Sequence, residues 1–387
     1  MEWRHDQYEI TEIKSMTKPR DERDKDSVKK GAAMVLRFVF LAGLVSSLVA
    51  CGGSSSGGAA GSDLKVALVT DIGKIDDGTF NQSAYEAGVR GSEQYGLLFD
   101  YKESAEEASY ATEIDFFVEE GYDMIVTVGF RMADITKEKA AEHTDVKFAI
   151  VDVAYDEYTE NLTGLTFTED EAGYMAGALA AKVTTTKSAG VIGGIAIPPV
   201  KRFVNGFVNG LLATCSDCTP QCVFVNSFTS AETGVAQAQS MITGNNVDVI
   251  FGAGGATGSG GVLQATNDGI YGIGVDTDEF FTTYKGGAET SSTRLLSSAI
   301  KKIDEAVFQE ITSLVEGGFE SGTKVFNAAN GGVGLSAYHS DAVTSEIQTE
   351  LATILTGLSD GTVATGVDSL GDNTANSSIS CGSVEVD

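Results

Sequence analysis

The feature that most constrains the fold is a repeated alternation of short apolar runs with longer segments of helical periodicity. The first set of runs has the length of strands, and the segments between them space their apolar residues as amphipathic helices do. The expected strands are Leu64–Val69, Leu97–Tyr101, Met124–Val128 and Phe148–Val153, and the expected helices are Asn81–Tyr95, Tyr110–Glu120 and Met132–His143. Such βαβ repetition predicts a parallel sheet covered by helices.

A second set of the same kind follows. Its expected strands lie near Leu162–Phe167, Ala189–Ile195, Val223–Phe228, Val247–Phe251 and Ile270–Val275, and its helices at Glu169–Val183, Lys201–Ala213, Ala231–Ile242 and Gly258–Asn267. Two such sets predict an α/β chain with two doubly wound lobes, at about 64–165 and 166–294. A ligand cleft is expected between the lobes, at the carboxyl ends of the strands.

The last part of the chain is expected to complete both lobes. A long helix at Leu295–Val315 would return to the first lobe, so part of 295–358 is assigned there. Lys324–His339 is interpreted as a strand with a loop, and Ala342–Leu358 as the last helix of a two-lobed domain over 64–358. Residues 359–387 are rich in Gly, Ser and Asn and are expected to form a flexible tail, unless Cys381 holds them.

The apolar run that starts at Val35 has the pattern of a secretory signal and is shorter than the ~20 residues of a spanning helix. It ends in Leu48-Val49-Ala50-Cys51, which resembles the lipobox of a bacterial lipoprotein. The resemblance implies that 34–50 is a removable signal peptide, that Cys51 carries a lipid, and that 51–63 is a Gly/Ser linker. The protein would then be anchored at the extracytoplasmic face of a cell membrane. An ordinary signal peptide, or a buried helix with a chance cysteine, is the alternative.

Residues 1–33 have a different character. They are polar, their acidic and basic residues balance, and they lack apolar periodicity. Because a signal peptide seldom has so long a preface, we expect translation to start at Met34, or else at Met16, which would make the extension a gene-model artefact.

Charge and cysteine content narrow the function classes. The formal net charge of −29 argues against nucleic acid as a partner and against electrostatic docking to anionic lipid. Besides Cys51 there are Cys215, Cys218, Cys222 and Cys381. In an exported protein they predict two disulfides, with three possible connectivities. A metal site at Cys215-x-x-Cys218-x-x-x-Cys222 is the alternative, which an oxidising envelope and the lack of a nearby His disfavour.

Several segments, in this order, resemble the BMP (basic membrane protein) family. The stretch Val69-Thr-Asp-Ile-Gly-Lys-Ile-Asp-Asp-Gly-Thr-Phe-Asn-Gln-Ser-Ala84 is similar to the opening signature of that family. Further similar segments are Val126–Phe130, Phe148–Asp152, Glu171–Gly177, Arg202–Gly210, Val247–Phe251, Gly274–Asp278 and Ser297–Lys301. The resemblance covers roughly Leu64 to Val315. It implies a type I periplasmic-binding-protein fold and a lipoprotein that passes a nucleoside, purine by expectation, to an ABC transporter permease. It implies a monomer without cofactor or metal.

The resemblance also assigns the ligand-contacting residues. Phe80 and Phe251 would stack on the base, which contributes roughly 1–3 kcal/mol per ring. Base-edge contacts would come from Asp71, Asp77 and Asp152. Asn81 is expected to satisfy the loop backbone, with the orientation of Asp71 or Asp77 as the alternative. Ribose contacts would come from Asp276, Lys301 and Gly255, because hydroxyl donors suit a carboxylate and glycine permits close backbone approach. Two departures bear on the preferred base: the purine receptor has Asn at the position of Asp77, and Gly-Gly-Thr where this chain has Gly255-Ala256-Thr257.

Plainer interpretations stand beside these assignments. A carboxylate after a strand, such as Asp71 or Asp152, often only caps the next helix. Phe80 and Phe251 could be core residues, and Phe203 and Phe207 are expected to be core and not to contact ligand.

Other function classes remain as alternatives. The glycines of 252–261 fit neither a dinucleotide fingerprint nor a P-loop, which disfavours an enzyme of those classes. A nucleoside hydrolase with Asp71, Asp76 and Asp77 around Ca²⁺ is a further alternative. A type I binding protein for a sugar, an amino acid or a signalling ligand is the other alternative. An amino-acid site would need an arginine, for which Arg131 is the candidate, and a sugar site would favour tryptophan, whereas Trp3 is the single one. A surface antigen without any ligand is the third class.

Overall fold

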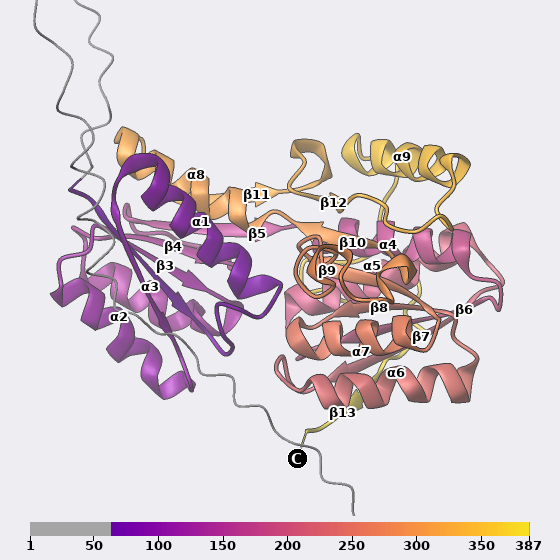
Figure 1. The fold of residues 1–387 in the computed structure, drawn as a ribbon. Helices are drawn as coiled ribbons and strands as arrows, with labels where there is room; N and C mark the ends of the chain where they lie inside the picture. Colours follow the sequence, from indigo (N-terminus) through magenta and orange to yellow (C-terminus); the bar gives the residue numbers. More distant parts are fainter. Residues whose placement is uncertain (1–62, 387) are drawn as a thin grey trace, which may run out of the picture. The chain divides into compact units, whose positions relative to one another are not determined.

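The computed structural model describes residues 63–386, which form two lobes, each a sheet with helices on both faces (Figure 1). The expected class, two doubly wound α/β lobes, is confirmed. The polar extension, the signal peptide, Cys51 and the linker up to residue 62 lie outside the described residues. Within 63–386, every helix is too short or too polar to cross a bilayer.

Lobe 1 has a parallel sheet with the strand order β11-β5-β4-β3-β1-β2. Helices α1 and α8 cover one face, and α2 and α3 cover the other (Figure 1). The central strands are almost fully buried, so they appear in the sequence as unbroken apolar runs. The elements are β1 (Lys65–Thr70), α1 (Phe80–Tyr95), β2 (Leu98–Glu103), α2 (Tyr110–Glu119), β3 (Met124–Val128), α3 (Ala133–Glu142), β4 (Lys147–Val151), β5 (Leu162–Phe167), α8 (Ile303–Glu316) and β11 (Gly322–Phe326).

Lobe 2 has the strand order β12-β10-β9-β8-β6-β7-β13, parallel except for β12. Helices α4 and α5 lie on one face of its sheet, α6 and α7 on the other, and α9 packs on α4. The elements are α4 (Glu169–Val183), β6 (Ser188–Gly193), α5 (Pro198–Thr214), β7 (Thr219–Val225), α6 (Ala231–Asn245), β8 (Val249–Ala253), α7 (Gly255–Asn267), β9 (Tyr271–Asp276), β10 (Leu295–Lys301), β12 (Val333–Leu335), α9 (Ser345–Ser359) and β13 (Gly382–Val384). Short 3₁₀ helices lie at Glu107–Ser109, Phe130–Met132, Lys285–Gly287, Ser292–Arg294 and Ala328–Asn330.

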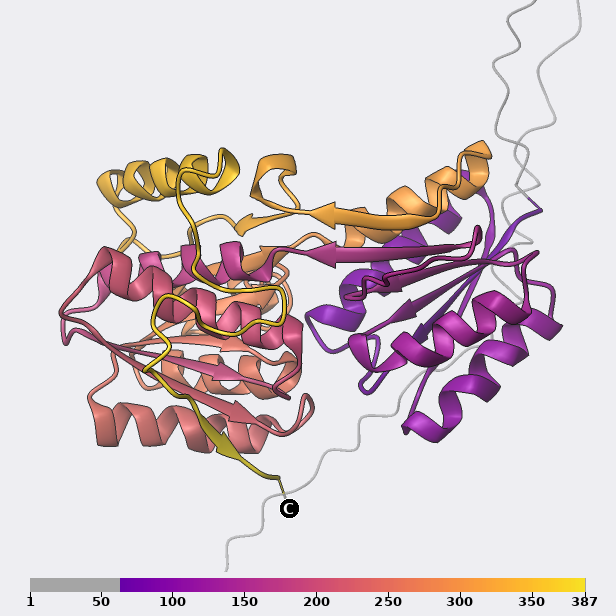
Figure 2. The ribbon, with the colours of Figure 1, turned by 180° about the vertical axis from the view of Figure 1, so that it is seen from behind.

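The chain passes between the lobes after β5, after β10 and after β11 (Figure 2). Two expectations are wrong here. Leu162–Phe167 is expected in the second set of strands, but as β5 it pairs with β4 and β11 in lobe 1. The expected helix Leu295–Val315 is strand β10 followed by helix α8. All seven residues of β10 are buried, and a fully buried strand lacks the polar alternation that distinguishes a strand from a buried helix.

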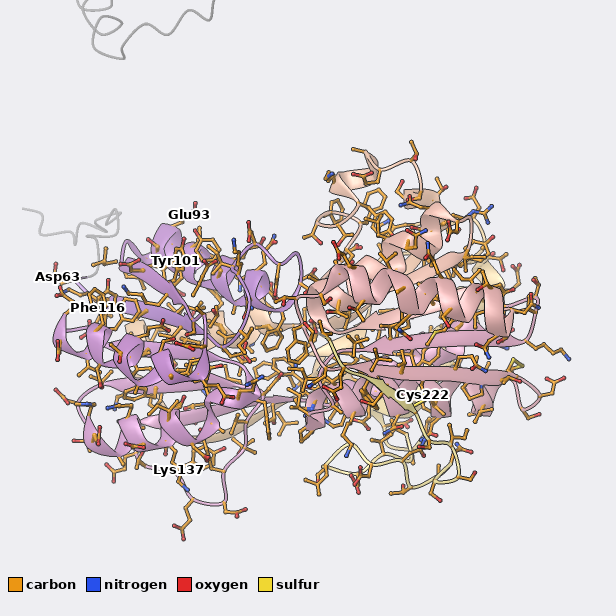
Figure 3. All side chains as sticks on the ribbon, turned by 90° about the horizontal axis from the view of Figure 1, so that it is seen from below. Asp63, Glu93, Tyr101, Phe116, Lys137 and Cys222 are labelled. Carbon is orange, nitrogen blue, oxygen red and sulfur yellow. A yellow bond between two sulfur atoms is a disulfide. The ribbon has the colours of Figure 1, made fainter. Side chains whose placement is uncertain are left out.

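The segment after Ser359 is held against lobe 2, so the expectation of a flexible tail is wrong. Cys381 holds the segment, which is the exception that the sequence suggests. Cys381 forms a disulfide with Cys222, and β13 pairs with β7 beside it (Figure 3). The other disulfide joins Cys215 to Cys218. These bonds occupy the sulfurs of the alternative metal site. The sequence could not choose this pairing, because one bond joins residues 159 positions apart.

Candidate ligand-binding site

A cavity of about 290 Å³ lies between the lobes and is lined by residues of both. Much of its lining follows the carboxyl ends of β1, β3, β4, β8, β9 and β10, because parallel strands end at one edge of each sheet. The structure brings eight of the nine expected ligand residues to this cavity: Asp71, Asp77, Phe80, Asn81, Asp152, Gly255, Asp276 and Lys301.

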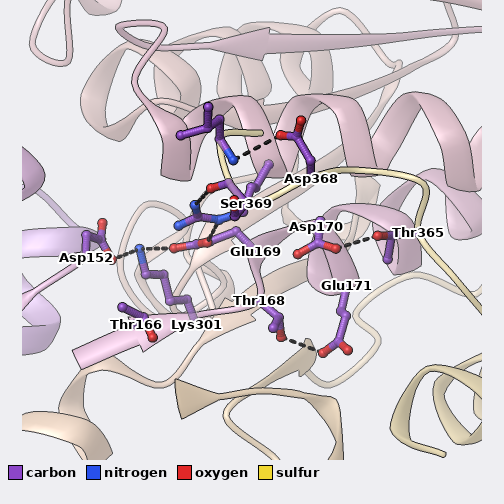
Figure 4. Close-up of polar contacts among 12 residues, drawn as sticks. Asp152, Thr166, Thr168, Glu169, Asp170, Glu171, Lys301, Thr365, Asp368 and Ser369 are labelled. Atoms are coloured by element: carbon purple, nitrogen blue, oxygen red, sulfur yellow. Dashed lines mark hydrogen bonds and ion pairs between the residues drawn. The ribbon is translucent and has the colours of Figure 1, made fainter. Parts of the chain in front are cut away.

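The charged centre of the cavity is Lys301, whose side chain is 2% exposed. Its Nζ lies 2.5 Å from Oδ1 of Asp152, in lobe 1, and 3.0 Å from Oε1 of Glu169, in the first turn of α4 (Figure 4). The ring centres of Phe80 and Phe167 each lie 5.0 Å from the same nitrogen. The pair of Lys301 with Asp152 therefore joins the two lobes at the ligand site.

Lys301 and Asp152 form a buried ion pair, and Glu169 is a third charged group beside Lys301. Burial would lower the pKa of Lys301, but the neighbouring carboxylates Asp152 and Glu169 raise it. Burial raises the pKa of Asp152, although Lys301 opposes this. Burial would also raise the pKa of Glu169, but Lys301 and Arg202 outweigh it and the net shift is downward. Lys301 and Glu169 are thus held in their charged forms.

Asp276, another carboxyl on the cavity, keeps free acceptor capacity. Asp276 is buried, and its Oδ1 makes no hydrogen bond to any described residue. Burial raises the pKa of Asp276 to about 8 and that of Asp71 to about 7. Asp276 and Asp152 also have left-handed backbones, with φ of 63° and 75°. Such strain at a strand end is typical of a functional site.

These raised pKa values predict a pH dependence. Asp71 and Asp276 bind protons more tightly in the folded protein than at the ordinary value of 3.8. The free energy of unfolding of ligand-free protein should therefore fall as the pH rises from about 4 to about 8, by at most about 1.4 kcal/mol per pH unit for each carboxyl. Urea unfolding at several pH values measures this slope. Asp276→Asn should make the slope of stability against pH less steep up to about pH 8, and Asp71→Asn should do so up to about pH 7. An unchanged slope in both variants would contradict the raised pKa values of these two carboxyls.

Asp77 stabilises the backbone at the start of α1. Its carboxylate accepts hydrogen bonds from the backbone N–H groups of Thr79, Asn81 and Gln82, at 2.9, 3.0 and 3.1 Å. It thus caps the start of α1 while it also borders the cavity. Asn81 contributes its backbone to this cap, and its buried Oδ1 has no hydrogen-bond partner within 63–386.

The structure does not bring Phe251 to the cavity. Phe251 is fully buried, stacks on Phe207 with ring centres 5.6 Å apart, and does not line the cavity. It sits in the middle of β8 and packs against α5, whereas the cavity lies beyond the end of the strand. Phe203, expected only in the core, lines the cavity and also packs against Phe251.

Sequence reasoning also missed Phe228 and Gly254, which line the cavity. The sequence predicts Phe228 at the end of a strand, but β7 ends at Val225, so Phe228 lies in the loop beyond it. An aromatic residue just past an apolar run is the signal that could have identified it. Gly255 has φ of +56°, and a Cβ there would lie 3.0 Å from the carbonyl oxygen of Phe228. Both facts favour glycine at this position.

The alternative amino-acid site lacks its arginine. Arg131 pairs with Glu107 at 2.5 Å and does not line the cavity. Apolar and aromatic surfaces with a few buried carboxylates and one buried lysine suit a small ligand that is rich in hydrogen-bond donors.

The family model for "ABC transporter substrate-binding protein PnrA-like" matches residues 64–357. Among similar proteins, "ABC transporter nucleoside-binding protein BmpA" of Lactococcus lactis is 32% identical over 82% of this chain and 94% of its own length. "CD4+ T-cell-stimulating antigen" of Listeria monocytogenes is 32% identical over 82% and 93%. "Basic membrane protein A" of Borreliella burgdorferi is 32% identical over 64% and 72%.

The fold is shared with solved structures. A solute-binding protein of an ABC transporter system from Aeropyrum pernix superposes with a TM-score of 0.70 at 22% identity, covering 78% of this chain and 92% of that one. This likeness confirms the expected type I periplasmic-binding-protein fold. The family match confirms the BMP resemblance and the expectation of a binding protein rather than an enzyme. The chain belongs to the PnrA-like family of ABC transporter substrate-binding proteins.

Proposed function

We propose that this protein binds a nucleoside, with a preference for purines, in the cavity between its lobes and delivers it to an ABC transporter permease. The observation that carries the proposal is the pairing of aromatic surfaces with free acceptors in one cavity: Phe80, Phe203 and Phe228 beside Asp276 and the pair of Asp152 with Lys301. The name of the Lactococcus lactis relative, a nucleoside-binding protein, supports the ligand class.

The two halves of a nucleoside need different contacts. A base needs apolar faces, which Phe80 offers from lobe 1 and Phe203 and Phe228 offer from lobe 2. Ribose hydroxyls need acceptors, which Asp276 supplies at the end of β9. Because the contacts come from both lobes, the ligand stabilises the closed arrangement relative to an open one.

Two polar contacts between the lobes act in the same direction. The hydroxyl of Thr277, in lobe 2, donates to the carbonyl oxygen of Gly78, in lobe 1, at 3.1 Å. Lys301 pairs with Asp152 across the same gap. A hinge motion in the three connections that opens the lobes would break both contacts. Ligand binding favours the closed lobes, and closure sets the surface that a permease meets.

Isothermal titration tests the ligand class directly. The soluble protein from Gly52 onward, unfolded and refolded to remove any carried ligand, is titrated with adenosine, guanosine, inosine, cytidine and uridine. We expect saturable one-to-one binding, strongest for a purine nucleoside. No heat with any of the five from a folded protein would contradict the nucleoside proposal and point to another small molecule in the same cavity.

A pair of phenylalanine variants provides the matched control. Phe80→Ala should weaken nucleoside binding by more than about tenfold, because it removes a stacking surface. Phe251→Leu should change affinity by less than about threefold and instead lower stability, by about 1 kcal/mol, because Phe251 is core. Equal affinity losses in both variants would place Phe251 back among the ligand contacts.

We also propose that the protein is a monomer anchored outside the cytoplasm through a lipid on Cys51. Substrate-binding proteins of ABC importers act outside the cytoplasm, and the Leu48-Val49-Ala50-Cys51 motif supports a lipid anchor. Mass spectrometry of the membrane-bound protein should find an N-terminal peptide that begins at diacylglyceryl-modified Cys51. A mature protein that retains Trp3 would contradict the anchor, and Cys51→Ser should leave the precursor unlipidated.

A further inference from the structure

The C-terminal tail, residues 360–386, is ordered against lobe 2 and lies beyond the residues that the family model matches. Asn209 of α5 holds its middle. The amide nitrogen of Asn209 donates to the carbonyl oxygens of Thr365 and Gly366, and its Oδ1 accepts from Asn373 and Asn376. The disulfide of Cys222 with Cys381 holds its end. The tail is therefore an ordered part of lobe 2.

A chain of polar contacts runs from this tail to the cavity. The backbone carbonyl of Ser369 accepts a hydrogen bond from Nη1 of Arg202 at 2.8 Å, and Nε of Arg202 donates to Oε2 of Glu169 at 2.6 Å. Oε1 of Glu169 lies 3.0 Å from Nζ of Lys301, which borders the cavity. Figure 4 shows Ser369, Glu169, Lys301 and Asp152 along this path.

Neighbouring contacts tie the tail to the same turn of α4. The hydroxyl of Thr365 donates to Oδ2 of Asp170 at 2.5 Å, next to Glu169 (Figure 4). Lys201, next to Arg202 on α5, pairs with Asp372 of the tail. The tail therefore contacts both α4 and α5, the helices that carry Glu169 and Arg202.

Charge balance explains why Arg202 matters to Lys301. Glu169 is fully buried between two cations, and without Arg202 the two carboxylates Asp152 and Glu169 would share the single charge of Lys301. A buried carboxylate without enough compensation is costly and moves or takes up a proton. The planar guanidinium fits this duty, because it donates to Glu169 and to the tail carbonyl from one rigid group.

We propose that Arg202 and Glu169 are positioning residues for Lys301, and that the tail, by holding Arg202, tunes ligand affinity from outside the cavity. Only the affinity measurements below rest on the proposed nucleoside function. The competing explanation is that the tail only stabilises lobe 2. In that case loosening the tail lowers stability and leaves the environment of Lys301 unchanged.

A measurement without ligand tests the contact chain first. In protein labelled with ¹⁵N-lysine, the Nζ signal of Lys301 is assigned by its loss in Lys301→Arg. Arg202→Met should shift that signal and speed its hydrogen exchange, and Arg202→Lys should restore it in part. A Lys301 signal unchanged in folded Arg202→Met protein, with folding checked by near-ultraviolet circular dichroism, would overturn the positioning role.

Nucleoside affinity tests whether Arg202 acts through Glu169. Arg202→Met should weaken binding by about threefold to thirtyfold, the range for residues that act through others. In a Glu169→Gln background the same substitution should have little further effect, because the neutral amide no longer needs a counter-charge. If Arg202→Met and Glu169→Gln lower the affinity additively, Arg202 does not act through Glu169 and the proposal is overturned.

The tail is tested without touching Arg202. Asn209→Ala and the double variant Cys222→Ser/Cys381→Ser each loosen it, and Cys215→Ser/Cys218→Ser removes the other disulfide as a matched control. The first two should shift the Lys301 signal and weaken binding, and the control should do neither. If all three behave alike, the role of the tail is overturned. If Lys301 responds but wild-type protein binds no nucleoside, the nucleoside proposal fails and the contact chain stands.

Discussion

Lys301→Met should lower the free energy of unfolding by about 3–5 kcal/mol at pH 7, because it leaves Asp152 and Glu169 buried without the cation between them. Nucleoside affinity should fall by at least about thirtyfold, since truncating one partner of a buried, hydrogen-bonded charge pair costs 2 kcal/mol or more. Urea unfolding and isothermal titration measure the two effects separately.

Two variants sharpen this test. Lys187→Met removes an exposed lysine that pairs with Asp217, and it should change stability by less than about 1 kcal/mol. Adding Asp152→Asn to Lys301→Met should recover part of the stability, because one unpaired carboxylate is removed, but not the affinity. A Lys301→Met protein with wild-type stability and affinity would show that this buried cation is dispensable.

The second large effect concerns the contact between α4 and α5. The two helices approach so closely that a Cβ at Gly177 would lie 2.1 Å from the carbonyl oxygen of Phe207, and one at Gly210 would lie 2.0 Å from that of Tyr174. These obstacles are backbone atoms, which cannot rotate away as a side chain can. Gly177→Ala should therefore lower the free energy of unfolding by about 3 kcal/mol or more, although Ala is the better helix former.

Gly244→Ala is the matched control. Gly244 lies in α6, and a Cβ there would meet nothing within 4 Å. The same substitution should stabilise the protein at this position by about 0.5–1 kcal/mol. Thermal or urea unfolding of the two variants should give changes of opposite sign. The folded fraction of Gly177→Ala should also bind ligand more weakly, because α5 carries Phe203 at the cavity. Stabilisation by both substitutions would contradict the backbone contact.

Periodicity predicted most of the elements because it reports local geometry. Met124–Val128 and Glu169–Val183 have the expected bounds, and nearly all other elements lie within a few residues of theirs. The failure at Leu295 has a physical cause, since β10 is buried on both faces and shows no alternation. A fully buried strand and a buried helix look alike in an apolar run.

The site was predictable to the extent that it consists of strand ends. Asp71, Asp152 and Asp276 directly follow or end an apolar run, and the carboxyl ends of parallel strands meet at one edge. The direction of a side chain within a strand was not predictable in the same way. Phe203 lines the cavity and Phe251 does not, because which of two aromatic residues reaches the cavity depends on where α5 packs on the sheet.

By itself the sequence determined the two α/β lobes, the edge at which the cleft lies and the polar residues that border it, because these follow from short-range periodicity and from the direction of parallel strands. Only the tertiary structure decided that Cys222 bonds Cys381, and that Ser369, Arg202 and Glu169 line up behind Lys301. Such partners lie far apart in the chain. Their meeting depends on how whole helices and the tail pack, which no local pattern of residues specifies.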